Sequence, residues 1–409
     1  MRRRAVPVLL AVVASLVSLG PADAQSLTLD PLVEGAEFPT NLASGEDGTL
    51  LYTEKVTGRV RVVEADGTLR SRPLAELEVT GDAERGLLGI AHMPGTQWIY
   101  LYLSDAADER NRVVRIPVQG GAAELVLDLL PSSSGYHNGG DLAFGLDGML
   151  YIVTGEAHDP DLAQDPASLG GKLLRMTPEG GVPDDNPTPG SLVFASGIRN
   201  SFGVCVDPRS GEVWETENGP DRDDEVNRIP AGANLGWPLQ LGPGGAPRFV
   251  DPVLTFEQVI VPTGCAVTPD GTVWFGDIAG NLHRVVVSGA EAQDAIVARL
   301  SAGIIDVATD PRGRLLVATT DTIYRQRIGP DPPSPTSPPD GSRGSAPVSD
   351  TGSSRWIAMV AAGVAVGAIV TLIASRRRSS GRRGGLSPGP GPGPGPGPGP
   401  GPGPGPGPG

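Results

Sequence analysis

Several residue types are scarce in this sequence, and each scarcity narrows what the chain can be. There are two cysteines, two lysines and four histidines, and aromatic residues make up 4% of the chain. Two cysteines suit an oxidising compartment, but they cannot build the disulfide framework of a small secreted scaffold. Residues 27–328 also lack a helical repeat of apolar residues, which argues against helices packed on a parallel sheet.

Basic side chains are outnumbered over most of the chain. Residues 25–355 contain 24 basic and 46 acidic residues, a net charge of −22. A surface of this sign repels phosphate backbones, so the composition excludes nucleic acid as a partner. It is compatible with calcium, a hard cation that prefers oxygen ligands, and equally with the solubility that an exported protein needs.

Both ends of the chain carry segments that are separate from the folded part. Residues 1–24 have a basic start, an apolar centre and a small-residue A-D-A site, which predicts a signal peptide. Residues 356–374 form an uncharged apolar run that is long enough for a transmembrane helix, and arginines follow it directly. The Pro, Ser and Gly content of residues 329–355 predicts an extended linker, and residues 375–409 read as a basic and then Pro-Gly-repeat tail.

This organisation predicts where the protein is located. Arginines on the C-terminal side of the apolar run favour a cytoplasmic tail, so the large N-terminal part is expected to be extracytoplasmic. The protein is then secreted across the membrane and anchored by one C-terminal helix, at the cell surface or in the periplasm. A sorting tail that is later cleaved is the alternative for this end of the chain.

One pattern recurs through the middle of the chain: a short apolar strand, a turn with Gly, Pro or Asp, and a strand with an aromatic residue or Leu. It occurs at 44–52, 91–102, 144–153, 206–215, 267–276 and 308–318. Each occurrence is followed by another strand with an arginine in or beside it. Six repeats of about four strands predict a six-bladed β-propeller over residues 25–328. A β-sandwich is the alternative, but it would not require a six-fold repeat.

The propeller places several polar side chains at one mouth of the central channel. The strand before each turn is expected to be the innermost one, and the residues just before these strands meet at one rim. They include one of the four histidines, His137, which stands ahead of a Gly-Gly pair. A strand-end histidine bonded to a neighbouring loop is the alternative interpretation of His137. The candidate rim residues are Glu84, Arg85, His137, Arg199, Asn200 and Thr263.

The two cysteines, Cys205 and Cys265, occupy similar strands in neighbouring blades. If the two strands are aligned on the tryptophan that follows each cysteine, the cysteines stand level. Alignment on the following proline shifts them by one residue and turns the side chains to opposite faces. The sequence leaves the disulfide open.

Five fragments of the sequence match a known protein family. Residues 84–91 (ERGLLGIA), 137–155 (HNGGDLAFGLDGMLYIVTG), 164–176 (QDPASLGGKLLRM), 196–200 (SGIRN) and 217–227 (ENGPDRDDEVN) resemble the soluble quinoprotein glucose/sorbosone and aldose sugar dehydrogenases. The order and spacing of these fragments are specific, although no single fragment is. The resemblance implies pyrroloquinoline quinone (PQQ) held by calcium at the channel mouth.

The resemblance also implies residue roles. His137 matches the general base that takes the proton of the sugar's anomeric hydroxyl, and Glu156 matches the carboxylate that orients it. Arg199 and Asn200 match the pair that contacts the cofactor, and Arg199 is also counted as catalytic. Glu84, Arg85 and Thr263 are candidate cofactor contacts. Backbone carbonyls of Gly219 and Pro220 match those that hold the cofactor's calcium, and Asp224 and Glu225 match a second, structural calcium site.

The chain departs from the family pattern at several places. Glu84 stands where the family often has glutamine, and Glu156 replaces the usual aspartate. An expected lysine is replaced by Ala279, and two expected arginines of the last blade by Gly303 and Ile305. Because PQQ carries three carboxylates, the loss of these cations puts its binding in doubt.

The expected function is a membrane-anchored, extracytoplasmic, PQQ- and calcium-dependent dehydrogenase that oxidises an aldose at the anomeric carbon to a lactone. Its electrons would pass to an external or membrane acceptor. The family also includes hedgehog-interacting-protein-like binding proteins, so a cofactor-less propeller that binds a sugar, polymer or protein is the alternative. A calcium-dependent lactonase is the third possibility.

Overall fold

The computed structural model describes residues 27–93, 95–131, 134–289 and 291–328. The predicted signal peptide, linker, transmembrane helix and tail lie outside these ranges. Within them, no helix combines the length and the apolar character that a membrane crossing requires.

In the described residues, twenty-four strands form six four-stranded antiparallel sheets, which confirms the predicted number of blades. Blade 1 contains β2 (Pro39–Ser44), β3 (Leu50–Glu54), β4 (Arg59–Val63) and β5 (Ala75–Glu76). Blade 2 contains β6 (Leu87–His92), β7 (Trp98–Ser104), β8 (Arg110–Pro117) and β9 (Glu124–Pro131). Blade 3 contains β10 (Gly139–Phe144), β11 (Leu150–Thr154), β12 (Lys172–Met176) and β13 (Val193–Ser196), with the short 3₁₀ helix η1 (Pro160–Ala163) between β11 and β12.

The remaining three blades follow the same order. Blade 4 contains β14 (Ser201–Val206), β15 (Val213–Glu217), β16 (Asp224–Ile229) and β17 (Leu254–Phe256). Blade 5 contains β18 (Pro262–Val267), β19 (Val273–Asp277), β20 (Asn281–Ser288) and β21 (Glu291–Arg299). Blade 6 contains β22 (Ile304–Thr309), β23 (Leu315–Thr319), β24 (Thr322–Gln326) and, from the other end of the domain, β1 (Leu29–Glu34).

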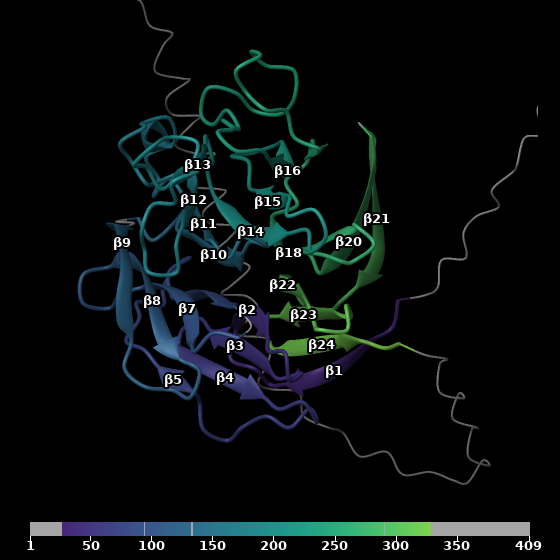
Figure 1. The fold of residues 1–409 in the computed structure, drawn as a ribbon. Coiled ribbons are helices and arrows are strands. Elements are labelled where there is room, and N and C mark those ends of the chain that lie inside the picture. Colours follow the sequence, from purple (N-terminus) through teal and green to yellow (C-terminus); the bar gives the residue numbers. More distant parts are fainter. Residues whose placement is uncertain (1–26, 94, 132–133, 290, 329–409) are drawn as a thin grey trace, which may run out of the picture. The chain divides into compact units, whose positions relative to one another are not determined.

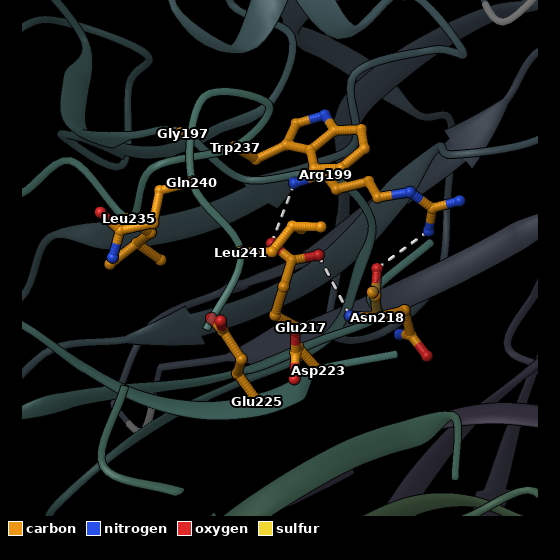
Figure 2. A pocket seen from close by; sticks show the side chains of 11 residues that line it. Gly197, Arg199, Glu217, Asn218, Asp223, Glu225, Leu235, Trp237, Gln240 and Leu241 are labelled. Atoms are coloured by element: carbon orange, nitrogen blue, oxygen red, sulfur yellow. Dashed lines mark hydrogen bonds between the residues drawn. The ribbon is translucent and has the colours of Figure 1, made fainter. Parts of the chain in front are cut away.

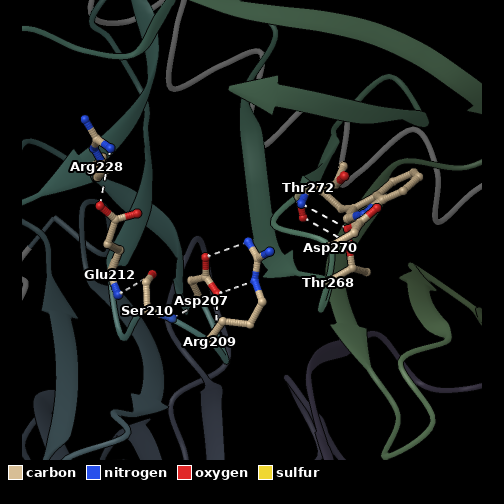
Figure 3. A network of polar contacts seen from close by, with 9 residues as sticks. Asp207, Arg209, Ser210, Glu212, Arg228, Thr268, Asp270 and Thr272 are labelled. Atoms are coloured by element: carbon tan, nitrogen blue, oxygen red, sulfur yellow. Dashed lines mark hydrogen bonds and ion pairs between the residues drawn. The ribbon is translucent and has the colours of Figure 1, made fainter. Parts of the chain in front are cut away.

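The turns predicted from the repeat are built by aspartates that accept hydrogen bonds from the backbone two residues later. Asp207 Oδ1 accepts the Arg209 N–H at 2.8 Å in blade 4, and Asp270 Oδ1 accepts the Thr272 N–H at 3.1 Å in blade 5 (Figure 3). The same contact recurs between Asp147 and Met149 in blade 3. A short polar side chain that bonds its own backbone in this way favours a turn over a continued strand.

The second strand of most blades is buried on both faces. Every residue of β3, β11, β15 and β23 is buried, because each of these strands is packed between the two neighbouring blades. Strands of this kind read as continuous apolar runs rather than as alternating ones. The hydrophobic core is therefore divided into clusters between successive blades, and no single central core exists in the described chain.

The ring closes through the first and last strands. The innermost strands contact one another in the order β2, β6, β10, β14, β18, β22 and back to β2. β1 pairs with β24, so the start of the domain completes its last blade (Figure 1). In Figure 1 the sequence colours run around the ring, and purple β1 lies beside green β24.

A disulfide joins Cys205 to Cys265, with Cα atoms 5.7 Å apart, and links blade 4 to blade 5. The hairpin registers pair Val206 with Val213 and Val267 with Val273, so the two cysteines stand one residue out of step. Neighbouring blades present opposite faces to each other. The offset therefore turns the two sulfurs together, although such an offset would separate them within one sheet.

Candidate active site

The expected rim residues lie at one end of the ring, opposite the aspartate turns. Because the strands are antiparallel, the start of β10 and the end of β11 meet at this end. His137 precedes β10, Glu156 follows β11, and Arg199 and Asn200 precede β14. The structure brings these four residues together, as predicted.

His137 and Glu156 form a buried pair. The ring Nδ1 of His137 lies 2.9 Å from Glu156 Oε1, and the two residues are 6% and 1% exposed. His137 has a backbone φ of +57°, which non-glycine residues adopt mainly where the surroundings hold them. With Nδ1 engaged by the carboxylate, Nε2 is the nitrogen left for a reacting group.

Burial controls the protonation of this pair. Burial, reinforced by the positive charge of Arg199, lowers the pKa of His137 to about 3. Burial also raises the pKa of Glu156 to about 7. The imidazole is therefore neutral at ordinary pH, which is the form that can accept a proton.

Glu84 connects the histidine to the Arg-Asn pair. Its Oε2 accepts the backbone N–H of His137 at 2.7 Å and the side-chain Nδ2 of Asn200 at 3.1 Å. The backbone N–H of Glu156 donates to the carbonyl of Arg199 at 2.9 Å. The loops of blades 2, 3 and 4 are thus held to one another at the mouth, and Glu84 fulfils a positioning role there.

Arg199 is held between an aromatic ring and the acidic segment that follows β15. Its guanidinium lies 5.5 Å from the centre of the Trp237 ring, and its Nη1 donates to the Asn218 carbonyl at 2.9 Å. Both backbone amides of Arg199 and Asn200 donate to the Glu217 carboxylate, at 2.9 and 2.8 Å. Figure 2 shows Trp237 and Glu217 on either side of this arginine's backbone.

The residues expected to hold calcium separate into two groups. Gly219 and Pro220 follow Asn218 directly, which places them on the loop that contacts Arg199. Asp224 instead faces backbone: it accepts the N–H groups of Gly219, Ile260 and Val261 at 2.7, 2.7 and 2.8 Å. These hydrogen bonds compensate its charge, so the acidic run does not require a cation at Asp224.

Glu225 lines a small cavity behind Arg199. The cavity has a volume of about 10 Å³, enough for the centre of one water molecule or ion. Glu217 and Asp223 also line it, whereas Asp224 does not. Burial raises the pKa of Glu225 to about 7. Among the described residues, no group of three His, Cys, Asp or Glu side chains is arranged so that it could hold a metal ion.

The other expected cofactor contacts are engaged elsewhere. Arg85 forms ion pairs with Asp82 and Glu109, at 2.8 and 2.7 Å. Thr263 lies in β18 and donates to the Ile304 carbonyl at 3.0 Å, which joins blade 5 to blade 6. Both contacts stabilise the rim, and neither is shown to aim a side chain at the channel mouth.

Three residues that support the site were missed at the sequence level. Lys55 at the end of β3 donates to the carbonyls of Gly81 and Ala83, in the loop that carries Glu84, and burial lowers its pKa to about 8. Lys172 is 1% exposed and donates to three carbonyls of the loop that follows Glu156. Trp237 is the third. The scarcity of lysine was a usable signal, because Lys172 is buried and Lys55 is half-buried.

The family model for glucose/sorbosone dehydrogenase matches residues 36–325. Aldose sugar dehydrogenase YliI of Escherichia coli (strain K12) is 42% identical over 232 residues, which cover 52% of this chain and 62% of that protein. Quinoprotein glucose dehydrogenase B of Acinetobacter calcoaceticus is 28% identical over 243 residues, covering 50% of this chain and 51% of its own. The PQQ-bound aldose sugar dehydrogenase of Streptomyces coelicolor superposes with a TM-score of 0.68 at 34% identity, covering 74% and 97% of the two chains.

Proposed function

Because the chain belongs to the glucose/sorbosone dehydrogenase family, we propose that it is a PQQ-dependent dehydrogenase that oxidises an aldose at the anomeric carbon to a lactone. The observation that carries this proposal is the buried His137–Glu156 pair beside Arg199 and Asn200. A base, its orienting carboxylate and a cation for an anionic cofactor are the parts that such an oxidation needs.

Each residue of the site has a distinct role in the proposed oxidation. PQQ, when bound, supplies the acceptor for the hydride that leaves the sugar. His137 Nε2 takes the proton of the anomeric hydroxyl, while Glu156 keeps the ring oriented and stabilises its positive charge. Arg199 holds negative charge at the mouth, and its stacking on Trp237 keeps the guanidinium in place.

The mouth contains two unsatisfied polar atoms on the side of blades 3 and 4. Glu156 Oε2 and Asn200 Oδ1 are buried, and the described residues offer neither atom a hydrogen-bond partner. Such atoms are costly unless a ligand or water satisfies them. Both atoms are hydrogen-bond acceptors, so they fit a ligand that offers hydroxyl or N–H donors, such as a sugar, whereas Arg199 fits an anionic group.

We extend the proposal to calcium. The carbonyls of Gly219 and Pro220 would hold the ion that accompanies the cofactor. The cavity that Glu225 lines has room for a second ion, whose remaining ligands would be backbone or water oxygens. Asp224 then serves as a support for the loop and not as a ligand.

The cellular setting is also part of the proposal. The propeller would work outside the cytoplasm, held by the apolar segment at 356–374, and would pass electrons to an external or membrane acceptor. The charge of residues 25–355 and the Cys205–Cys265 disulfide support an oxidising, extracytoplasmic location.

The experiment is a reconstitution of the purified protein with calcium and PQQ, followed by dye reduction across a panel of aldoses. Sugar-dependent reduction and micromolar binding of PQQ by calorimetry are expected. Calcium alone should raise the melting temperature, and removal of calcium with a chelator should abolish the activity. Failure to bind PQQ at high micromolar concentration would exclude the dehydrogenase.

A propeller that has lost the cofactor and binds a sugar, polymer or protein is the second candidate. It is favoured by the side chains of blades 5 and 6, where Ala279, Gly303 and Ile305 provide no positive charge. Binding of the same sugars without PQQ, and without dye reduction, would establish it.

A further inference from the structure

We propose that His158 is a second proton acceptor of the site, which receives the proton from His137 and delivers it to solvent. The proposal rests on the proposed dehydrogenase function, because it concerns the proton that the base removes from the sugar. It adds a residue that lies two positions beyond Glu156.

The two imidazoles are direct neighbours. The ring centres of His137 and His158 lie 4.5 Å apart, with an angle of 59° between the ring planes. His137 is 6% exposed, whereas His158 is an exposed residue. The rings are in contact but share no hydrogen bond in the described residues, so a proton would pass between them through one water molecule. The pair therefore connects the buried base with the outside of the molecule.

The base needs such an outlet. The charged groups that face His137 are Glu156 on its Nδ1 side, Glu84 at its backbone and Arg199, whose positive charge disfavours a second cation nearby. A buried imidazolium beside a guanidinium is a poor place to leave a proton. Each turnover would deposit one proton on His137, and the ring must return to the neutral form before the next sugar can react.

The backbone is shaped to place His158 against His137. Ala157 and His158 have φ values of +54° and +66°, two consecutive non-glycine residues in the left-handed region. Strain of this kind persists only where surrounding contacts impose it. Here the Ala157 N–H donates to the His137 carbonyl at 3.0 Å, and the Asp159 N–H donates to the Glu156 carbonyl at 2.9 Å.

Hydrogen bonds from Lys172 and Gln164 hold the rest of the loop that follows Glu156. Lys172 Nζ donates to the carbonyls of Leu162, Ala163 and Gly170, at 2.6, 3.1 and 2.8 Å. Gln164 Nε2 donates to the Trp237 carbonyl at 2.6 Å, which ties the same loop to the ring that stacks on Arg199. His158 is thus an exposed side chain on a rigidly held segment, and its position next to the base is built into the fold.

The step is a simple proton transfer. The N–H bond of the His137 imidazolium breaks, a new N–H bond forms on the neutral His158 ring, and the proton then leaves to water or buffer. No electron is moved and no further reactant is needed. An imidazole suits this task because a ring nitrogen can both accept a proton and give one up.

The test uses the variant His158→Asn in the full chain with calcium and PQQ, since asparagine tolerates a left-handed φ better than most residues. At low buffer concentration kcat should fall by about 10–100-fold, with the KM for sugar and the Kd for PQQ unchanged. Added imidazole should restore most of the loss. The control His92→Gln, in blade 2 away from the mouth, should show neither the loss nor the rescue. An unchanged kcat, or a loss that imidazole does not restore, would overturn the relay.

A second readout needs neither cofactor nor sugar. In an NMR pH titration of the cofactor-free protein, the ring signals of His137 should follow the protonation of His158, and this response should vanish in His158→Asn. If His137 does not respond in the wild type, the relay is wrong. If the response is present but no sugar is oxidised, the dehydrogenase proposal fails while the coupling between the two rings stands.

Discussion

The channel mouth and the outer part of blade 5 each contain a buried histidine, and the two histidines differ in their surroundings. On the side of blades 2 to 4, His137 is buried beside Arg199 and one carboxylate, and burial lowers its pKa to about 3. In blade 5, His283 lies between Asp294 and Asp277, at 2.9 and 3.3 Å, and stacks on Phe275. Burial disfavours its charge, but the hydrogen bonds to the two carboxylates outweigh burial and raise its pKa to about 9.

The difference shows how neighbours assign a role to one residue type. A neutral ring with one nitrogen unclaimed by a carboxylate can exchange protons, and such a ring suits catalysis. A charged ring with both nitrogens bonded to carboxylates is a structural cation, and it holds β20 to β19 and β21. His137 at the mouth is therefore suited to catalysis, whereas His283 stabilises blade 5.

The largest effect is expected at His137. The variant His137→Asn keeps a residue that tolerates φ of +57° but removes the base, so kcat/KM for the aldose should fall by about 10²–10⁴-fold. Binding of PQQ should change little. The measurement is steady-state dye reduction, with calorimetry for the cofactor.

His283→Gln is the matched comparison for this variant. It removes the other buried histidine, and at pH 6 it should lower the melting temperature while leaving kcat/KM within about twofold of the wild type. An equal loss of activity in both variants would contradict the assignment of the catalytic role to His137.

The next largest effect is expected at the disulfide that joins blade 4 to blade 5. The disulfide closes a loop of 60 residues, so the double variant Cys205→Ser and Cys265→Ser should lose about 4 kcal/mol of unfolding free energy. Urea unfolding of the variant and of the wild type, with and without a reductant, measures this. A reductant should destabilise only the wild type; equal stability of the two proteins would show that the bridge does not constrain the unfolded chain.

The sequence predicted the residues of the channel mouth better than it predicted the contact between blades 4 and 5. The six-bladed propeller and the meeting of His137, Arg199 and Asn200 followed from a repeat and from residues that stand just before strands, whereas Glu156 was expected only from the family resemblance. In an antiparallel blade these positions share one end regardless of details. The disulfide could not be decided, because whether a one-residue offset joins or separates two cysteines depends on which faces the neighbouring blades present.

The expected metal ligands of the acidic segment show a second limit of prediction from sequence. The spacing of Asp223, Asp224 and Glu225 is compatible with a metal site, but hydrogen bonds from Ile260 and Val261 engage Asp224. These donors lie more than thirty residues away in sequence, so no local pattern reveals them. The roles of Lys55 and Lys172 were hidden for the same reason, since their acceptors are backbone carbonyls, which leave no mark on the sequence.

A pH effect on stability distinguishes the structural histidine. The pKa of His283 is raised from 6.5 to about 9 in the folded protein, so its stabilisation is complete below about pH 6.5 and is lost as pH rises through 9. The shift corresponds to about 3 kcal/mol. The difference in unfolding free energy between wild type and His283→Gln, measured by urea unfolding from pH 6 to 10, should decline over this window. A difference that is constant with pH would mean that the ring is not charged in the folded state.

The smallest effect is expected from introducing an arginine in blade 6, at a place where the family pattern has one and this chain has none. Arginine cannot replace Gly303 without a rearrangement, because a Cβ there would lie 2.6 Å from the Ile278 carbonyl oxygen. Ile305 already carries a side chain and is only half-buried, so Ile305→Arg is the suitable variant. One added charge-assisted contact should tighten PQQ binding by about tenfold, whereas Ile305→Leu should leave the affinity unchanged. If the arginine has no effect on the Kd measured by calorimetry, the cofactor does not extend toward blade 6, and Arg199 and Lys55 must balance its carboxylates from the other side.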